Sequence, residues 1–225
     1  MFEQLIQREN AIFDILQIFL DSNMNFILVG GYAVSSFKHR FSMDADVVIK
    51  SEDLDKFEDT LRKNNFKRTI SKELNNLYST KFIRFEKNKE LKISIDLFID
   101  GIGIRQTNSV ISFDKINKNS SKRKVEGTEK EIEVKIPIRE LLIALKLQSG
   151  RLTDFRDIVA LFKNVETSKV KEFMKDTDKN ILKKNIKHLI SLLNKKEFID
   201  SFKGVFIEKK YDINIEEVKS LKGLV

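Results

Sequence analysis

The chain lacks cysteine and tryptophan, and its 225 residues include a single proline. Without cysteine, the protein can form no disulfide framework, no thiolate metal site and no cysteine nucleophile. No apolar run approaches the roughly 18 residues that a membrane-spanning helix needs. The first residues, MFEQLIQREN, include early acids and no small-residue cleavage site, so we expect no secretory signal. These absences favour a cytoplasmic protein that does not enter a membrane.

Positive charge is in surplus. The chain has 42 lysines and arginines against 34 acids, which gives a formal net charge of +8. Such a surplus can hold a polyanion, because neutralising phosphates drives non-specific binding to nucleic acids. A lysine-rich surface that faces only water would have the same composition. Charge alone therefore leaves both interpretations open.

The pattern of apolar residues changes near Pro137, the only proline. We expect an α/β core over 1–136 and a helical C-terminal region over 137–225, because apolar residues recur at helical spacing only after this point. The basic run over 115–124 predicts a loop, Gly127 a hairpin turn, and Ser51 the N-cap of a helix. The predicted helices span about 3–22, 32–37, 51–64, 141–147, 155–162, 170–174, 181–193 and 198–206. The predicted strands span about 26–29, 45–49, 66–70, 79–85, 92–99 and 132–136.

The most informative stretch is FILVGGYAVSSFKHRFSMDADVVI, which covers residues 26–49. A buried strand leads into Gly30-Gly31, a short helix follows, and the next strand carries Asp44 and Asp46. Side chains at positions i and i+2 of a strand point to the same face, so the two aspartates project side by side. Asp96 lies on another strand, within ISIDLFI, and can join them.

Three clustered carboxylates beside a glycine turn suit a magnesium–nucleotide site. Mg²⁺ prefers oxygen ligands, and two ions can activate a nucleophile and stabilise a leaving pyrophosphate. We predict that Asp44 and Asp46 bind two Mg²⁺ ions and that Asp96 binds the catalytic ion, with Mn²⁺ as the alternative metal. A Gly-Gly sequence by itself usually forms only a turn, and two aspartates by themselves usually face solvent. The apolar flanks of Asp46 and Asp96 favour function, because unpaired buried carboxylates are costly.

The arrangement of Gly30-Gly31, Asp44-Ala45-Asp46 and Asp96 resembles the signature of the DNA polymerase β-like nucleotidyltransferase superfamily. Arg40 and Ser42 precede the aspartate pair as in the R-x-[ST]-x-D-x-D pattern of small prokaryotic members. The resemblance implies an α+β fold with a nucleotidyltransferase-type mixed β-sheet flanked by helices. It also implies an NTP substrate whose phosphates Gly30, Gly31, Ser42 and Arg40 would contact.

A second motif, KLQSGRLTDFRDI over 146–158, resembles K-L-x-A-G-R-x-K-D-x-x-D-[IV] of AbiEii-like proteins. Those proteins are toxins of bacterial and archaeal toxin–antitoxin systems, so the resemblance implies an antitoxin partner. Ser149 and Thr153 depart from the pattern. The motif gives Lys146 a catalytic role and gives Arg151 a role at the triphosphate.

The spacing of this second motif also has a physical interpretation. Asp154 and Asp157 are i, i+3 neighbours on one face of a predicted helix, so they can position Lys146 or Arg151 at a nucleotide. Arginine can grip phosphate with two parallel hydrogen bonds, and lysine meets it as a compact cation. An ordinary surface network of ion pairs would have the same spacing.

Together these features predict a magnesium-dependent nucleotidyltransferase that moves an NMP from an NTP to an acceptor hydroxyl and releases pyrophosphate. RNA, such as the 3′ end of tRNA, is the favoured acceptor because of the basic charge and the toxin resemblance. A protein acceptor is the rival. A degenerate nucleotidyltransferase fold that only binds nucleotide or RNA is the alternative outside the enzymes, and the presence of all three aspartates argues against it.

Overall fold

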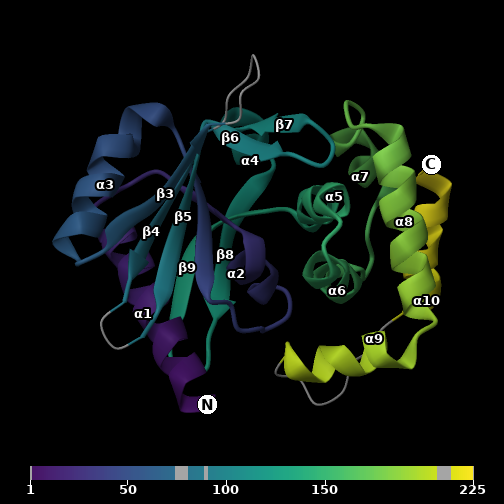
Figure 1. Cartoon of the computed structure of the whole chain (residues 1–225), viewed down its shortest axis with the longest axis horizontal. Coiled ribbons are helices and arrows are strands. Elements are labelled where there is room, and N and C mark those ends of the chain that lie inside the picture. Colours follow the sequence, from purple (N-terminus) through teal and green to yellow (C-terminus); the bar gives the residue numbers. More distant parts are fainter. Residues whose placement is uncertain (1, 74–80, 89–90, 207–213, 225) are drawn as a thin grey trace. The chain divides into compact units, whose positions relative to one another are not determined.

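A computed structural model describes residues 2–73, 81–88, 91–206 and 214–224 (Figure 1). The chain divides into two compact units. The first unit comprises residues 1–37, 41–103 and 110–137, and the second comprises 38–40, 104–109 and 138–225. Among the described residues, no helix combines the length and the apolar character needed to cross a bilayer.

The first unit contains a five-stranded sheet with the strand order β1-β2-β5-β4-β3. Strands β2 and β5 are parallel, and their other neighbours are antiparallel, so the sheet is mixed as expected. The elements up to the fifth strand are α1 (Phe2–Asp21), β1 (Ile27–Val29), α2 (Gly30–Ser35), β2 (Asp44–Ile49), the 3₁₀ turn η1 (Ser51–Asp53), α3 (Leu54–Lys63), β3 (Lys67–Glu73), β4 (Lys81–Lys87) and β5 (Ile93–Ile99).

Two smaller sheets follow in the chain. One pairs β6 (Gly101–Ile104) with β7 (Ser109–Ser112), and the other pairs β8 (Ser120–Glu126) with β9 (Glu131–Pro137). The helix α4 (Phe113–Lys118) lies between β7 and β8 in the sequence. Gly127 donates its backbone N–H to the carbonyl of Lys130 at 2.8 Å, which confirms the predicted hairpin turn.

Helix α1 buries the apolar stripe that its sequence predicts. Phe13, Leu16 and Phe19 are at most 2% exposed, and the helix packs on β5 and α3. The ring of Phe19 meets that of Phe57 on α3 edge to face, with centroids 4.9 Å apart. Burying aromatic rings removes a large apolar area from water, so these contacts hold α1 and α3 together.

Two predictions about this unit are wrong. The run over 115–124 is the end of α4 followed by β8, because the backbone of β8 pairs with β9 along the whole strand. Lys122 and Lys124 are exposed, whereas the guanidinium of Arg123 lies 4.1 Å from the ring centroid of Phe37. Ser51 is not a side-chain N-cap, since it lies inside η1. Its backbone N–H instead donates to the carboxylate of Asp100 at 2.8 Å, so a residue distant in sequence satisfies this helix start.

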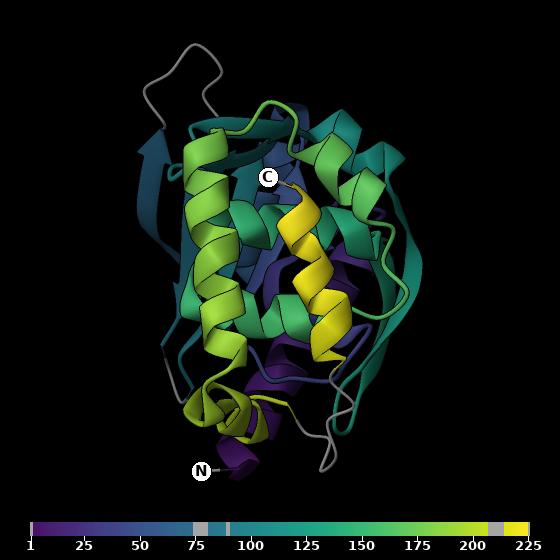
Figure 2. The same ribbon diagram turned by 90° about the vertical axis from the view of Figure 1, so that its right-hand side faces the viewer.

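The second unit is helical. Its longest helix, α8, lies against α5 and the C-terminal helices (Figure 2). The predicted helix over 198–206 is divided, because a 3₁₀ turn follows α9. The elements are α5 (Arg139–Ser149), α6 (Leu152–Leu161), α7 (Thr167–Phe173), α8 (Lys179–Leu193), α9 (Lys196–Asp200), η2 (Ser201–Gly204), α10 (Ile215–Lys219) and η3 (Ser220–Leu224).

Candidate active site

The diglycine turn joins β1 directly to α2 and lies against an aspartate. Gly30 has a φ of +66°, which an L side chain rarely adopts. A Cβ built on Gly30 would lie only 1.8 Å from Oδ2 of Asp46. Both the backbone conformation and the close approach therefore require glycine at this position. Gly31 follows it as a buried residue of α2.

Strand register places the three predicted aspartates together. Asp46 on β2 pairs with Val29 on one side and with Asp96 of the parallel strand β5 on the other. Asp44 precedes Asp46 by two residues and so points to the same face of the sheet. We call Asp44, Asp46 and Asp96 the acidic face.

The three carboxylates of the acidic face differ in their surroundings. The side chain of Asp96 is 5% exposed, whereas that of Asp44 is 37% exposed. Ser42 donates its hydroxyl to Oδ1 of Asp44 at 3.0 Å, and its own carbonyl accepts a hydrogen bond from the hydroxyl of Tyr32. Ser42 therefore orients Asp44 rather than standing apart from it.

Arg84 is a site residue that the sequence reasoning missed. It lies on β4 directly opposite Asp96. Its Nε and Nη2 donate to the two carboxylate oxygens of Asp96 at 2.7 and 2.6 Å, and Nη2 lies 3.5 Å from Oδ2 of Asp44. An arginine between the apolar residues Ile83 and Phe85 of the strand KFIRFEK was the available signal, but its partner depends on the register of β4 and β5.

The acidic face shifts the ionisation of its members. Burial raises the pKa of Asp96, as do the nearby charges of Asp44 and Glu86, while the hydrogen bonds and charge of Arg84 act in the opposite direction. The hydrogen bond to Asp96 raises the pKa of Arg84 above its usual value, so the guanidinium stays charged.

The acidic face fits a divalent metal in the chemistry of its donors. Carboxylate oxygens are the ligands that Mg²⁺ prefers. Among the described residues, however, no three acidic, histidine or cysteine side chains stand ready as a metal-binding group. Both oxygens of Asp96 accept hydrogen bonds from Arg84, whereas Asp44 and Asp46 take no part in these two hydrogen bonds. A metal that used all three carboxylates would have to compete with Arg84.

The second motif forms a tight corner between two helices. Helix α5 ends at Ser149, Gly150 adopts a φ of +66°, and α6 begins at Leu152. A Cβ on Gly150 would lie 2.4 Å from Nδ2 of Asn185, which donates to the carbonyl of Leu147. The glycine therefore allows both the left-handed turn and the close packing of α8 that reinforces it.

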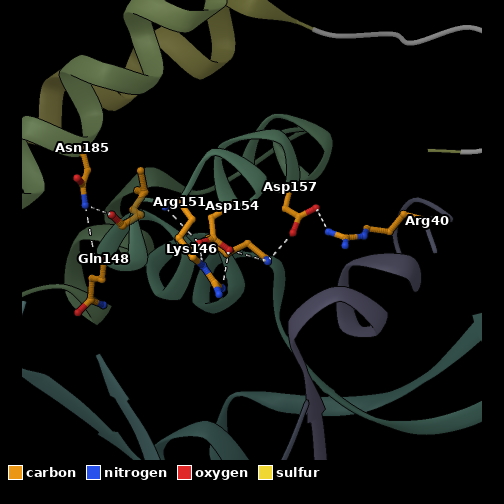
Figure 3. A network of polar contacts seen from close by, with 8 residues as sticks. Arg40, Lys146, Gln148, Arg151, Asp154, Asp157 and Asn185 are labelled. Carbon is orange, nitrogen blue, oxygen red and sulfur yellow. Dashed lines mark hydrogen bonds and ion pairs between the residues drawn. The ribbon is translucent and has the colours of Figure 1, made fainter. Parts of the chain in front are cut away.

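This corner aligns charges of alternating sign into what we call the charge network (Figure 3). Lys146 donates to Asp157 at 2.6 Å and to Asp154 at 3.4 Å. Asp157 also accepts from Arg40 at 2.5 Å, and Asp154 accepts from Nε of Arg151 at 2.7 Å. The network thus runs from Arg40 through Asp157, Lys146 and Asp154 to Arg151.

The centre of the charge network is buried. The side chains of Lys146, Asp154 and Asp157 are 9%, 3% and 2% exposed, whereas that of Arg151 is 69% exposed. Burial alone would raise the pKa of Asp154, but the charge of Lys146 and the contacts with Arg151 outweigh it and lower this pKa. The network is therefore not the ordinary surface array that the spacing also allowed.

The predicted site residues fall into two sets, each within one unit. In the first unit the structure brings together Gly30, Gly31, Ser42, Asp44, Asp46 and Asp96. In the second unit it brings together Arg40, Lys146, Arg151, Asp154 and Asp157. Their roles at a nucleotide stay predictions.

Comparison with known proteins identifies the fold. No protein-family model matches the sequence, and a search of curated proteins finds no match. Among solved structures, the chain is similar to the antibiotic-resistance factor ANT(2″)-Ia, an aminoglycoside nucleotidyltransferase. The TM-score is 0.50 at 14% identity, covering 74% of this chain and 88% of that chain. At this identity the likeness shows the fold alone, which is a nucleotidyltransferase-type α+β fold, and it gives no support to the AbiEii-like branch.

Proposed function

We propose that the protein is a magnesium-dependent nucleotidyltransferase that moves an NMP from an NTP to an acceptor hydroxyl. The observation that carries this proposal is the strand register that places Asp44, Asp46 and Asp96 on one face of the sheet, with Asp46 against the diglycine turn. The nucleotidyltransferase-type fold supports it. We also propose that the protein acts in the cytoplasm.

The three aspartates of the acidic face would have different roles in the reaction. Asp44 and Asp46 would hold Mg²⁺ ions, with Mn²⁺ as the alternative, and Asp96 would complete the site of the catalytic ion. When bound, the metal would neutralise charge on the triphosphate and make the acceptor hydroxyl more acidic. Asp96 would help to remove the proton of that hydroxyl. The acceptor oxygen would then bond to the α-phosphorus as the bond to pyrophosphate breaks.

The charge network offers cations for phosphate. Among the described residues it contains three cations, Arg40, Lys146 and Arg151, and two carboxylates, so positive charge is in excess there. Arg151 exposes most of its side chain, and arginine can hold phosphate with parallel hydrogen bonds. We propose Arg151 as the phosphate contact and Lys146 as the buried cation that holds the two carboxylates beside it.

RNA is the acceptor that we favour. Helix α8 carries Lys179, Lys183, Lys184 and Lys187 and no acidic residue. All four lysines are exposed, and in the part of the chain that the structure describes none of them forms an ion pair. Unpaired lysines on one helix suit the phosphates of a polynucleotide. A toxin role with an antitoxin partner belongs to this proposal and rests only on the resemblance of the second motif.

Labelling tests the proposal directly. The protein is incubated with Mg²⁺, total RNA or cell lysate, and each of four α-³²P-labelled NTPs, beside the variants Asp46→Asn and Asp114→Asn. Asp114 lies on α4 with its side chain 84% exposed, so its variant is a matched control. Loss of a metal-ligand charge should lower transfer by about a thousandfold in Asp46→Asn and leave Asp114→Asn active.

The label also identifies the acceptor. A product that RNase destroys supports RNA, whereas a product that only protease destroys supports a protein acceptor. Equal labelling by the wild type and Asp46→Asn would refute the proposed site. NTP binding that depends on Mg²⁺, without transfer to any acceptor, would favour the alternative of a nucleotide-binding module.

A further inference from the structure

Arg84 lies within the acidic face, although no part of the proposed reaction uses it. Among the described residues, the ion-pair and hydrogen-bond partners of its guanidinium are Asp96 and Asp44. Its guanidinium donates hydrogen bonds to both oxygens of Asp96 and lies within ion-pair distance of Asp44. The strand pairing of β4 with β5 holds this geometry, because Arg84 and Asp96 face each other in the register.

Asp96 needs such a partner. A carboxylate that is 5% exposed loses much of its hydration and is stable in its charged form only beside a positive group. The planar guanidinium satisfies both oxygens at once, which a lysine could not do. A divalent cation that binds Asp96 would use at least one of these same oxygens and would place a second positive charge beside the guanidinium, so the two positive groups compete for Asp96.

We propose that Arg84 is an internal counter-ion of Asp96 with which a divalent metal must compete. Arg84 is therefore a positioning residue: it holds the third carboxylate in place before metal binds and lowers the affinity of the acidic face for the metal. The inference rests on the proposed function in one respect, since it takes Asp44, Asp46 and Asp96 as the metal ligands.

The surroundings of Arg84 permit this exchange. Its side chain is 28% exposed, so its head reaches solvent while the carboxylate that it binds does not. Asp44 lies 3.5 Å from Nη2, so a metal held by Asp44 and Asp96 would compete with the guanidinium at both carboxylates. The ring of Phe82 lies 6.0 Å from the guanidinium carbon and provides an apolar surface beside it.

Manganese binding without nucleotide tests the inference. Mn²⁺ is titrated into the wild type, Arg84→Met and Arg68→Met, and free Mn²⁺ is measured by electron paramagnetic resonance. Arg68 lies on the neighbouring strand β3 and pairs with Glu58, so its variant removes an arginine of the same sheet outside the acidic face. Removing a charged hydrogen-bonding competitor should tighten Mn²⁺ binding about ten- to a hundredfold in Arg84→Met and leave Arg68→Met unchanged.

Thermal unfolding with and without Mn²⁺ gives a second measurement. Without metal, Arg84→Met should unfold at a lower temperature than the wild type, because Asp96 has lost its partner. Mn²⁺ should then raise its unfolding temperature by more than it raises that of the wild type, because a ligand that binds the folded state more tightly stabilises it more. A merely structural role of Arg84 would not produce this larger gain. Mn²⁺ binding by Arg84→Met that is equal to or weaker than that of the wild type would overturn the inference.

Two further results keep this inference separate from the proposed function. If Arg84→Met does not fold, Arg84→Lys can replace it in the test. Lysine retains the positive charge but cannot donate two parallel hydrogen bonds to Asp96, so this variant should bind Mn²⁺ several times more tightly than the wild type. Unchanged binding would overturn the inference. If the wild type transfers no nucleotide, while Arg84→Met still gains Mn²⁺ affinity, the proposed function fails and the role of Arg84 stands. If the wild type transfers nucleotide but Arg84→Met binds Mn²⁺ no more tightly than the wild type, the inference about Arg84 fails and the proposed function stands.

Discussion

Two clusters in this protein pair buried aspartates with basic side chains, and they differ in the charge that is left over. The acidic face sets one guanidinium, Arg84, against three carboxylates. The charge network sets three cations against two carboxylates. Among the described side chains, carboxylates therefore outnumber cations in the acidic face, and cations outnumber carboxylates in the charge network. From this difference we expect the first cluster to bind a cation and the second an anion.

The clusters also differ in how their buried groups are satisfied. In the charge network, Lys146 contacts both Asp154 and Asp157 from within one helical corner, so each buried charge has a partner supplied by the fold. In the acidic face, Asp96 depends on Arg84, which is partly exposed. Among the described residues, the buried charges of the network thus have their partners within it, whereas we propose that the partner of Asp96 in the acidic face can be exchanged.

The largest effect on stability is expected from Lys146→Met. This variant leaves Asp154 and Asp157 buried without their shared cation, and breaking a buried pair in this way costs about 3–5 kcal/mol. Urea unfolding should show this loss, with Lys171→Met on the exposed face of α7 as a control. Mn²⁺ should restore none of the lost stability, in contrast to Arg84→Met. If Mn²⁺ restored the stability of Lys146→Met, the two clusters would not differ in their response to metal.

An intermediate effect is expected from Gly30→Ala. The new Cβ would overlap the carboxylate of Asp46, and the left-handed backbone costs about 1–2 kcal/mol for an L side chain. Displacing Asp46 should weaken Mn²⁺ binding as well as stability. Gly223→Ala is the matched control, because a Cβ there meets nothing within 4 Å. Unchanged metal affinity in Gly30→Ala would show that the diglycine turn does not position Asp46.

The smallest effect is expected from Asp154→Asn, and it should depend on pH. The folded protein lowers the pKa of Asp154, so its ionised form contributes stability above the unfolded pKa of about 3.9, and this contribution is lost as pH falls through the folded pKa. Asp154→Asn should therefore be less stable by about 1 kcal/mol at pH 7, and the difference should shrink below about pH 4.

Urea unfolding of the wild type and Asp154→Asn between pH 7 and 3 measures this difference. Asp176→Asn changes an exposed aspartate of the same unit and serves as control. A stability difference that stays constant over this range would show that the charge of Asp154 is not what stabilises the network. The charge network would then resemble an uncharged hydrogen-bonded corner more than an array of ions.

Local rules were sufficient to predict much of the fold. The i, i+2 spacing put Asp44 and Asp46 on one face of a strand, and the helical periodicity predicted α1, α5 and α8 within a few residues. The mixed sheet with flanking helices is confirmed. These features depend on neighbours in the sequence, whose relative positions are set by the geometry of a single strand or helix.

Tertiary structure decided the features that depend on residues far apart in the chain. The pairing of β8 with β9 turned an expected loop into a strand, and the carboxylate of Asp100 satisfied the backbone N–H of Ser51. The register of β4 against β5 set Arg84 on Asp96, and the contact with Asp46 made glycine necessary at position 30. The amino-acid sequence specified which charged and apolar side chains this protein has and on which face of a strand or helix they lie. Only the packing of strands determined which of those groups meet, because hydrogen-bonded register is a property of two strands and not of either one alone.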